Sequence, residues 1–102
     1  MDMKQMMRQA QKMQKQLAQA QEELKTMTYE ASAGGGIVKA VANGEMAIES
    51  IVIDPDAVDP EDVEMLQDMV LAAVNEALRG MNEISSTKLN SVTGGMNIPG
   101  MM

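Results

Sequence analysis

The first 27 residues carry apolar side chains at alternating spacings of three and four positions, the a/d pattern of a coiled coil. The positions in this seam are Met3, Met6, Ala10, Met13, Leu17, Ala20, Leu24 and Met27. They predict a helix over 2–27, about 39 Å long, whereas a compact chain of this length has a radius of gyration of about 13 Å. We therefore expect the helix to project from its domain. The seam packs either within the chain or, as we favour for at least part of it, against a second copy.

Between residues 28 and 53 the pattern changes to short runs that are typical of strands. We expect strands over 28–33, 37–42 and 45–53, joined first by three glycines and then by Asn43-Gly44, a pair that favours a two-residue type I′ turn. This register gives one face with Ile37, Val41, Met46, Ile48 and Val52 and another with Val38, Ala40, Glu45, Ala47 and Glu49. The second face is polar at one end only, so another chain can cover part of it.

A second helix is predicted over 60–90. Asp59 is the expected N-cap and Pro60 the first helical residue. The apolar stripe of this helix is wider than the seam of the first one, so we expect the second helix to cover the sheet and the first to reach outward. The prediction is one α+β domain over 1–93, with α-β-β-β-α order and a three-stranded antiparallel sheet. The Gly- and Met-rich residues 94–102 are expected to form a flexible tail.

The net charge of −7, from 8 basic and 15 acidic residues, is unevenly distributed. Residues 1–21 have four basic residues and one acidic residue, a local charge of +3, and residues 22–102 have four basic and fourteen acidic ones, a local charge of −10. The four early cations, hereafter the basic face, fall on the side of the predicted helix away from the seam. They are Lys4, Arg8, Lys12 and Lys15. Such a face is either solvated surface or a phosphate-binding surface, and the many neighbouring glutamines, which can donate to phosphate oxygens, favour the second interpretation.

The chain has no His, Cys, Phe or Trp, which argues against several function classes. The usual ligands of zinc and iron–sulfur clusters and the Cys–His nucleophile pairs are absent, and no Phe or Trp can stack on unpaired bases. The serines and threonines near residues 85–91 have no base or oxyanion loop around them, so we expect no enzyme and no cofactor. No apolar run is long enough for a membrane span or a signal peptide, which favours a cytosolic protein.

Two motifs look like ligand sites only superficially. The acidic run over 54–64 lacks the spacing and the glycine of an EF-hand, and acidic residues at a helix start are stabilised by the helix dipole. We therefore interpret it as helix capping and expect no metal. Residues 34–39, GGGIVK, are not followed by a helix, so we interpret them as a tight strand connection and not as a phosphate loop.

Four stretches of the sequence together resemble the YbaB/EbfC family of small bacterial nucleoid-associated proteins. They are MKQMMRQAQKMQKQLAQAQEEL, AGGGIVKAVANG, SIVIDPDAVDPEDVEMLQDMVLAAVNEAL and SVTGGMNIPGMM. The resemblance runs through nearly the whole chain and implies a homodimer whose first helices project like the arms of tweezers. It also implies binding of double-stranded DNA, with a change in DNA conformation, within the nucleoid. By matching position it points to the basic face for DNA contact, with Lys25, Lys39 and Lys88 as weaker candidates.

The sequence departs from many relatives in two places. It begins MDMK, without a Gly-rich basic segment before the first helix, and Glu45 and Glu49 follow Asn43-Gly44 where relatives often carry basic residues. Both departures remove expected phosphate contacts and imply weaker DNA binding than in the family generally. Our first hypothesis is a dimeric architectural DNA-binding protein with little sequence readout. The alternative is a dimeric interaction scaffold whose arms or Met-rich tail hold a protein partner.

Overall fold

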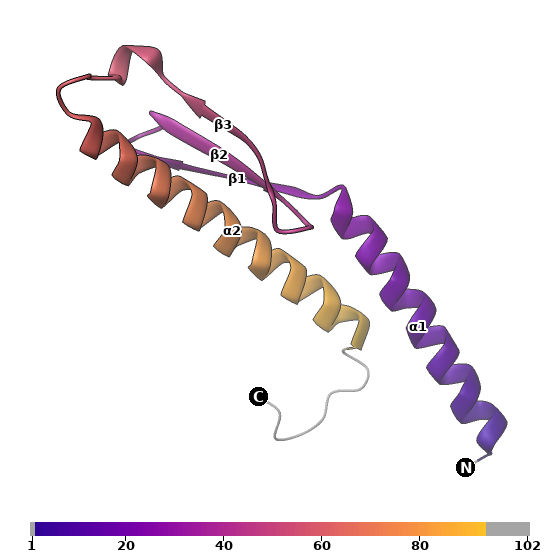
Figure 1. Ribbon diagram of the computed structural model, residues 1–102. Coiled ribbons are helices and arrows are strands. Elements are labelled where there is room, and N and C mark those ends of the chain that lie inside the picture. The colour runs from indigo at the N-terminus through magenta and orange to yellow at the C-terminus, as the bar shows by residue number, and fades with distance from the viewer. Residues whose placement is uncertain (1, 94–102) are drawn as a thin grey trace, which may run out of the picture.

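Two helices and one antiparallel sheet make up residues 2–93, the part of the chain that the computed structural model describes (Figure 1). The elements in chain order are α1 (Met3–Lys25), β1 (Thr28–Ala33), β2 (Val38–Asn43), β3 (Ile48–Ile53), the short 3₁₀ helix η1 (Pro55–Ala57) and α2 (Val63–Thr93). They confirm the predicted α-β-β-β-α order and the three-stranded antiparallel sheet. The tail predicted over 94–102 lies outside the described residues.

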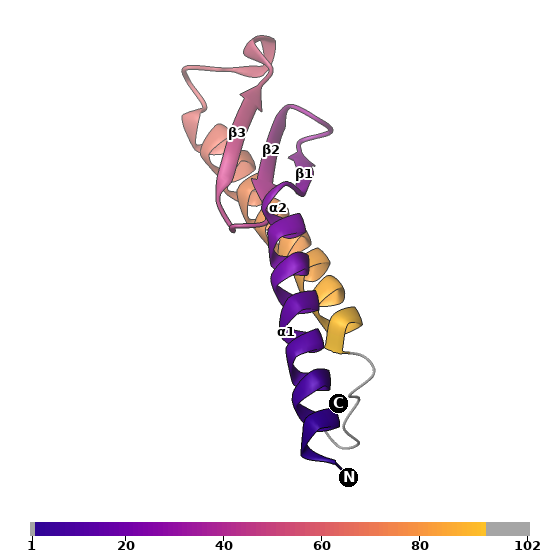
Figure 2. The ribbon, with the colours of Figure 1, turned by 90° about the vertical axis from the view of Figure 1, so that its right-hand side faces the viewer.

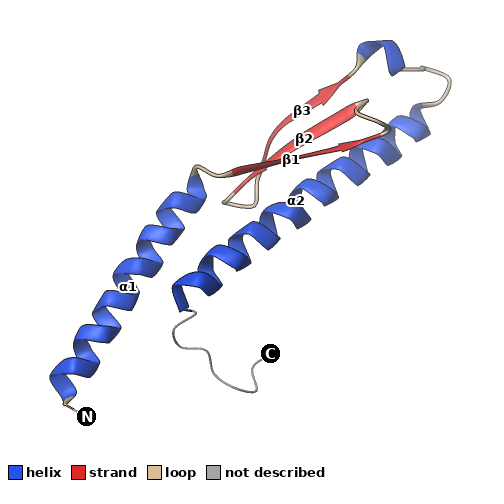
Figure 3. Ribbon diagram, turned by 180° about the vertical axis from the view of Figure 1, so that it is seen from behind, coloured by secondary structure: helices blue, strands red, loops and turns tan. Residues whose placement is uncertain are grey.

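One face of the sheet is covered by α2. The strands lie in the order β1-β2-β3, and Figure 3 shows α2 running along them and continuing past the end of the sheet. The fully buried side chains at this contact are Val38, Ala40 and Ala42 from β2 and Ala73, Ala77 and Met81 from α2. Most of these side chains are small, so helix and sheet can approach closely. Gly80 extends the same principle, because a Cβ at this position would lie 2.2 Å from the Tyr29 ring.

The connection between β2 and β3 is longer than the predicted two-residue turn and spans residues 44–47. The Asn43 side-chain oxygen accepts hydrogen bonds from two backbone N–H groups of this loop, at 2.9 and 3.2 Å. Positive φ occurs at Met46, at 61°, and not at Asn43 or Gly44, so the type I′ prediction is wrong. Gly44 instead permits a close approach, because a Cβ there would lie 1.8 Å from the Leu24 carbonyl oxygen at the end of α1.

The longer loop changes which side chains share a face of the sheet. Val41 pairs with Ser50 and not with Met46, and a bulge follows Val41. Ile48 pairs with Ala42, so it lies on the covered face and not, as predicted, beside Val41. The face that was expected to be partly polar is the one that α2 buries, because its alanines allow the helix to come close.

The start of α2 also differs from the prediction. Asp59 accepts a hydrogen bond from the Glu61 N–H group, at 2.9 Å, within a turn that precedes the helix. Asp62 accepts one from the Met65 N–H group, at 3.3 Å, in the first turn of the helix. The side chain that caps α2 is therefore Asp62, and the prediction of Asp59 as the N-cap is wrong.

α1 projects from the sheet, as its length predicted. The protein measures 71 × 28 × 16 Å and has a radius of gyration of 19.7 Å, well above the value of about 13 Å for a compact chain of this length. Figure 2 shows α1 beside the last turns of α2, and Figure 1 shows the N-terminus of α1 beyond the end of α2. The first half of α1 is therefore an arm that the rest of the described chain does not cover.

Candidate nucleic-acid interface

The basic face lies on this arm, and all four of its side chains are exposed. Arg8, Lys12 and Lys15 line one continuous surface together with Gln11 and Gln14. No ion pair joins any cation of the basic face to another residue among 2–93. The arm therefore presents uncompensated positive charge on one side of a helix.

The three weaker candidates lie in different surroundings. Lys25 pairs with Glu22 on its own helix, at 3.3 Å between Nζ and Oε2. Lys39 is exposed on β2, beside Val52, on the face of the sheet that α2 leaves open. Lys88 on α2 pairs with Glu23 on α1, at 2.6 Å between Nζ and Oε2. Of these three, only Lys39 has no ion pair with a carboxylate among residues 2–93, and it does not lie on the arm.

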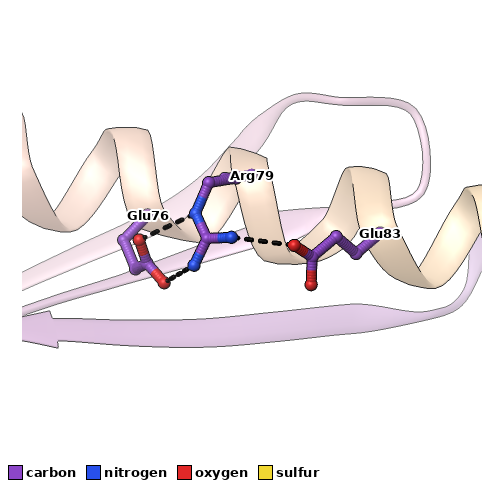
Figure 4. A network of polar contacts seen from close by, with 3 residues as sticks. All are labelled: Glu76, Arg79 and Glu83. Carbon is purple, nitrogen blue, oxygen red and sulfur yellow. Dashed lines mark hydrogen bonds and ion pairs between the residues drawn. The ribbon is translucent and has the colours of Figure 1, made fainter.

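The remaining cation outside the arm, Arg79, also forms ion pairs with carboxylates (Figure 4). Its guanidinium donates to both carboxylate oxygens of Glu76 and, at 2.8 Å from Nη1, to Glu83. The bond to Arg79 lowers the pKa of Glu76, and the two carboxylates raise the pKa of Arg79, Glu76 having the larger effect. Arg79 therefore offers little charge to a ligand.

The seam of α1 is divided between a covered half and an open half. Ala20 and Leu24 are each 4% exposed and are buried by the protein's own chain, and Met13 and Leu17 are half-buried. Met3, at 75%, and Met6, at 54%, are open to solvent, as is Ala10. Met27 lies just after the helix and is 37% exposed. A seam between two copies stays a prediction for the open positions.

Sequence reasoning missed an apolar surface on the first half of α2. Leu66, Val70, Leu71 and Val74, hereafter the apolar patch, line it together with the single polar residue Gln67. Leu71 is 60% exposed, which is unusual for a large aliphatic side chain in a run of apolar residues. The signal in the sequence was the width of the α2 stripe, which the sheet covers only in part.

Two kinds of site are not found among residues 2–93. No group of three or more carboxylates is placed to hold a metal ion. Neither helix has a stretch that is long and apolar enough to cross a membrane.

Comparison with known proteins gives a consistent family. The sequence model of the YbaB/EbfC DNA-binding family matches residues 1–96. A nucleoid-associated protein of Thermoanaerobacter pseudethanolicus is 55% identical over 96 residues, covering 94% of this chain and 86% of the relative. Another nucleoid-associated protein, of Pelotomaculum thermopropionicum, is 55% identical over 100 residues, covering 98% of this chain and 95% of the relative.

The fold also has a counterpart among solved structures. The crystal structure of an uncharacterized protein of Helicobacter pylori matches with a TM-score of 0.71 and 26% identity, covering 85% of this chain and 91% of the other. The matched family is one of DNA-binding proteins and not of enzymes. The chain belongs to the YbaB/EbfC DNA-binding family.

Proposed function

We propose that the protein is a nucleoid-associated protein that binds double-stranded DNA as a homodimer, mainly through contacts between the basic face of α1 and backbone phosphates. Membership of a DNA-binding family and the names of the relatives support DNA as the partner and the nucleoid as the location. The single observation that carries the mode of contact is the exposed charge of the basic face, which no carboxylate among residues 2–93 pairs with, on an arm that projects from an acidic body.

The geometry of the arm suits phosphate contact better than base reading. At 1.5 Å per residue the basic face spans about 16 Å along the helix axis, with its first three cations about 6 Å apart. The cations are long, flexible side chains, and such contacts fix register and orientation while carrying no sequence information of their own. We therefore expect binding with little sequence preference and with a strong dependence on salt.

A titration of duplex DNA at two salt concentrations tests this proposal. Reversing two charges of the basic face, Lys12→Glu with Lys15→Glu, should weaken binding strongly at low salt. Reversing Lys39 alone is the control, because Lys39 likewise has no ion pair with any of residues 2–93 but lies on the sheet. Binding that survives both high salt and the reversals on the arm would overturn the proposal.

The apolar patch is where we place the homodimer contact. α2, which carries this patch, contacts the edge strand β3, whose Ile51 is 44% exposed on the covered face of the sheet, where it pairs with the buried Ala40. One edge of β3 has no neighbouring strand among residues 2–93, so its backbone groups are open to pairing. Burial of this surface against a second copy leaves the basic face of both arms uncovered, whether or not the open seam positions also pair, so that one dimer presents two basic faces to DNA. Two contacts held at a fixed separation can bend or bridge a duplex, which is the conformational change that we include in the proposal.

Leu71→Asp tests the dimer contact, since it places a charge in the apolar patch without removing a buried side chain. We expect a monomer in analytical ultracentrifugation with unchanged helical content. Met65→Asp is a matched control, because Met65 is similarly exposed, at 53%, but does not line the patch. A dimer that persists in the Leu71 variant, or dissociates equally in the control, would refute this placement.

A second candidate function is favoured by one observation, the exposure of Met3, Met6 and Met7 near the free end of the arm. Unbranched, polarizable methionine side chains suit an adaptable protein contact. A protein captured from nuclease-treated lysate by the native chain, and lost when these three residues are replaced by Gln, would favour the scaffold. Capture that disappears with nuclease treatment favours DNA.

A further inference from the structure

The base of the arm is tied to α2 by one ion pair. Glu23 lies in the last turns of α1 and Lys88 in the last turns of α2, and the two are far apart in the sequence. Their charged groups are 2.6 Å apart, and the Lys88 side chain is 24% exposed, against 50% for Glu23. The other ion pairs within 2–93 join residues three or four positions apart on the same helix. Among residues 2–93, this pair is therefore the ion pair that joins the two helices.

The surroundings of the pair place it at the joint on which the arm is mounted. Gln16, Gln19 and Ala20 from α1 and Ser91 and Val92 from α2 line the surface around it. Ala20 is buried here, so the aliphatic stem of Lys88 lies where α1 meets α2, with its charged end on Glu23. The next residue of α1, Leu24, is approached closely by Gly44, so the backbone at the base of the arm is also packed against the loop between β2 and β3.

We infer that Lys88 is a positioning residue and not a DNA contact: by holding Glu23 it fixes the direction of α1 and so the placement of the basic face on DNA. This inference rests on the proposed function. Glu23 lies about 12 Å along the helix axis from Lys15, the nearest cation of the basic face. The Lys88 ammonium group already contacts a carboxylate at hydrogen-bond distance, and this negative charge offsets the attraction that Lys88 would have for a phosphate.

The two possible roles of Lys88 predict opposite effects of one substitution on DNA affinity. Glu23→Gln removes a negative charge near DNA and releases Lys88, so a DNA-contact role predicts tighter binding and a steeper salt slope by about 0.9 per arm. A positioning role predicts weaker binding, because the arm loses its link to α2, with the salt slope unchanged. The expected loss is small, about two- to fivefold per arm, since the pair is partly exposed.

Glu22→Gln is the matched control. It makes the same change in composition and charge at the adjacent position, and the only ion pair that it breaks within 2–93 is the local one between Glu22 and Lys25. We expect Glu22→Gln to leave DNA affinity unchanged or slightly increased. Two further variants complete the set: Lys88→Arg should retain affinity, and the charge swap Glu23→Lys with Lys88→Glu should restore what Lys88→Glu alone loses.

A readout without DNA separates this inference from the proposed function. Hydrogen exchange of the α1 backbone amides around residues 16–24 should accelerate in Glu23→Gln and stay at the native rate in Glu22→Gln. Equal exchange in the two variants, or tighter DNA binding by Glu23→Gln, would overturn the positioning role. If DNA binding does not depend on Lys12 and Lys15 while hydrogen exchange still responds to Glu23→Gln, the proposed function is wrong, but the role of the ion pair in holding α1 against α2 is supported.

Discussion

Neutralising half of the basic face, by Lys12→Gln with Lys15→Gln, should flatten the salt dependence of DNA binding without abolishing it. Each arm carries four exposed cations, so the two arms of the proposed homodimer neutralise at most eight phosphates. The slope of log K against log salt is about −0.9 per phosphate, which gives the native dimer a limit of about −7 and the variant, with four cations left, a limit of about −3.6.

The assay is the fluorescence anisotropy of a short labelled duplex, titrated at several salt concentrations. Between about 50 and about 200 mM salt the affinity of the native dimer should fall by up to roughly 10⁴-fold, and that of the variant by up to roughly 10²-fold. Lys25→Gln with Lys39→Gln removes the same charge from outside the basic face. A slope that does not change in the Lys12 and Lys15 variant, or flattens equally in this control, would refute the assignment of phosphate contacts to the basic face.

Three further predictions concern the fold. Gly80→Ala should lower the free energy of unfolding by about 1–3 kcal/mol in urea denaturation, because the added methyl group would overpack the Tyr29 ring. In a Tyr29→Ala background, Gly80→Ala should instead be neutral or stabilising, since alanine is a better helix former than glycine. Gly44→Ala should cost at least as much, because the Leu24 carbonyl oxygen is a backbone atom that cannot rotate away; a smaller loss would contradict the close approach. The stability difference between the native chain and Glu23→Gln should be present at neutral pH and shrink as pH falls below 4.5, the ordinary value for glutamate, because the hydrogen bond from Lys88 lowers the pKa of Glu23 in the folded state. A difference that is independent of pH would count against that ion pair.

The regular spacing of apolar residues made the helices predictable. The helix cap and the loop between strands were predicted less well, because more than one local structure fits their residues. The seam of α1 repeats over many turns, so its ends fall within two residues of the prediction. At the start of α2 two aspartates can each cap a helix, and the choice of Asp62 over Asp59 is made by the fold around them. At Gly44 the sequence indicates a glycine requirement but not its cause, which here is the approach of Leu24 and not a positive φ.

In the candidate site, too, features set by spacing within one helix could be predicted, and contacts between elements could not. Spacing alone puts the basic face on one side of a helix, because each member lies three or four residues, about one turn, from the next along the same element. The pair between Glu23 and Lys88 joins two helices that are separated by the whole sheet in sequence, and no periodicity predicts it. The apolar patch had a visible signal, the width of the α2 stripe, but which part of that stripe stays uncovered depends on how far the sheet extends.

The pairing of the cations explains how an acidic protein can bind DNA. Outside the arm, Lys25, Arg79 and Lys88 each contact a carboxylate, so the body presents mainly negative charge and is repelled by phosphates. That repulsion is screened over about 8 Å at physiological salt, whereas at 0.01 M salt it extends about 30 Å. Because the molecule is 71 Å long and the arm projects from one end, physiological salt separates the attraction of the arm from the repulsion of the body. DNA affinity should therefore stop rising, and the slope of log K against log salt should flatten, as salt falls toward the range in which the body's charge reaches the arm.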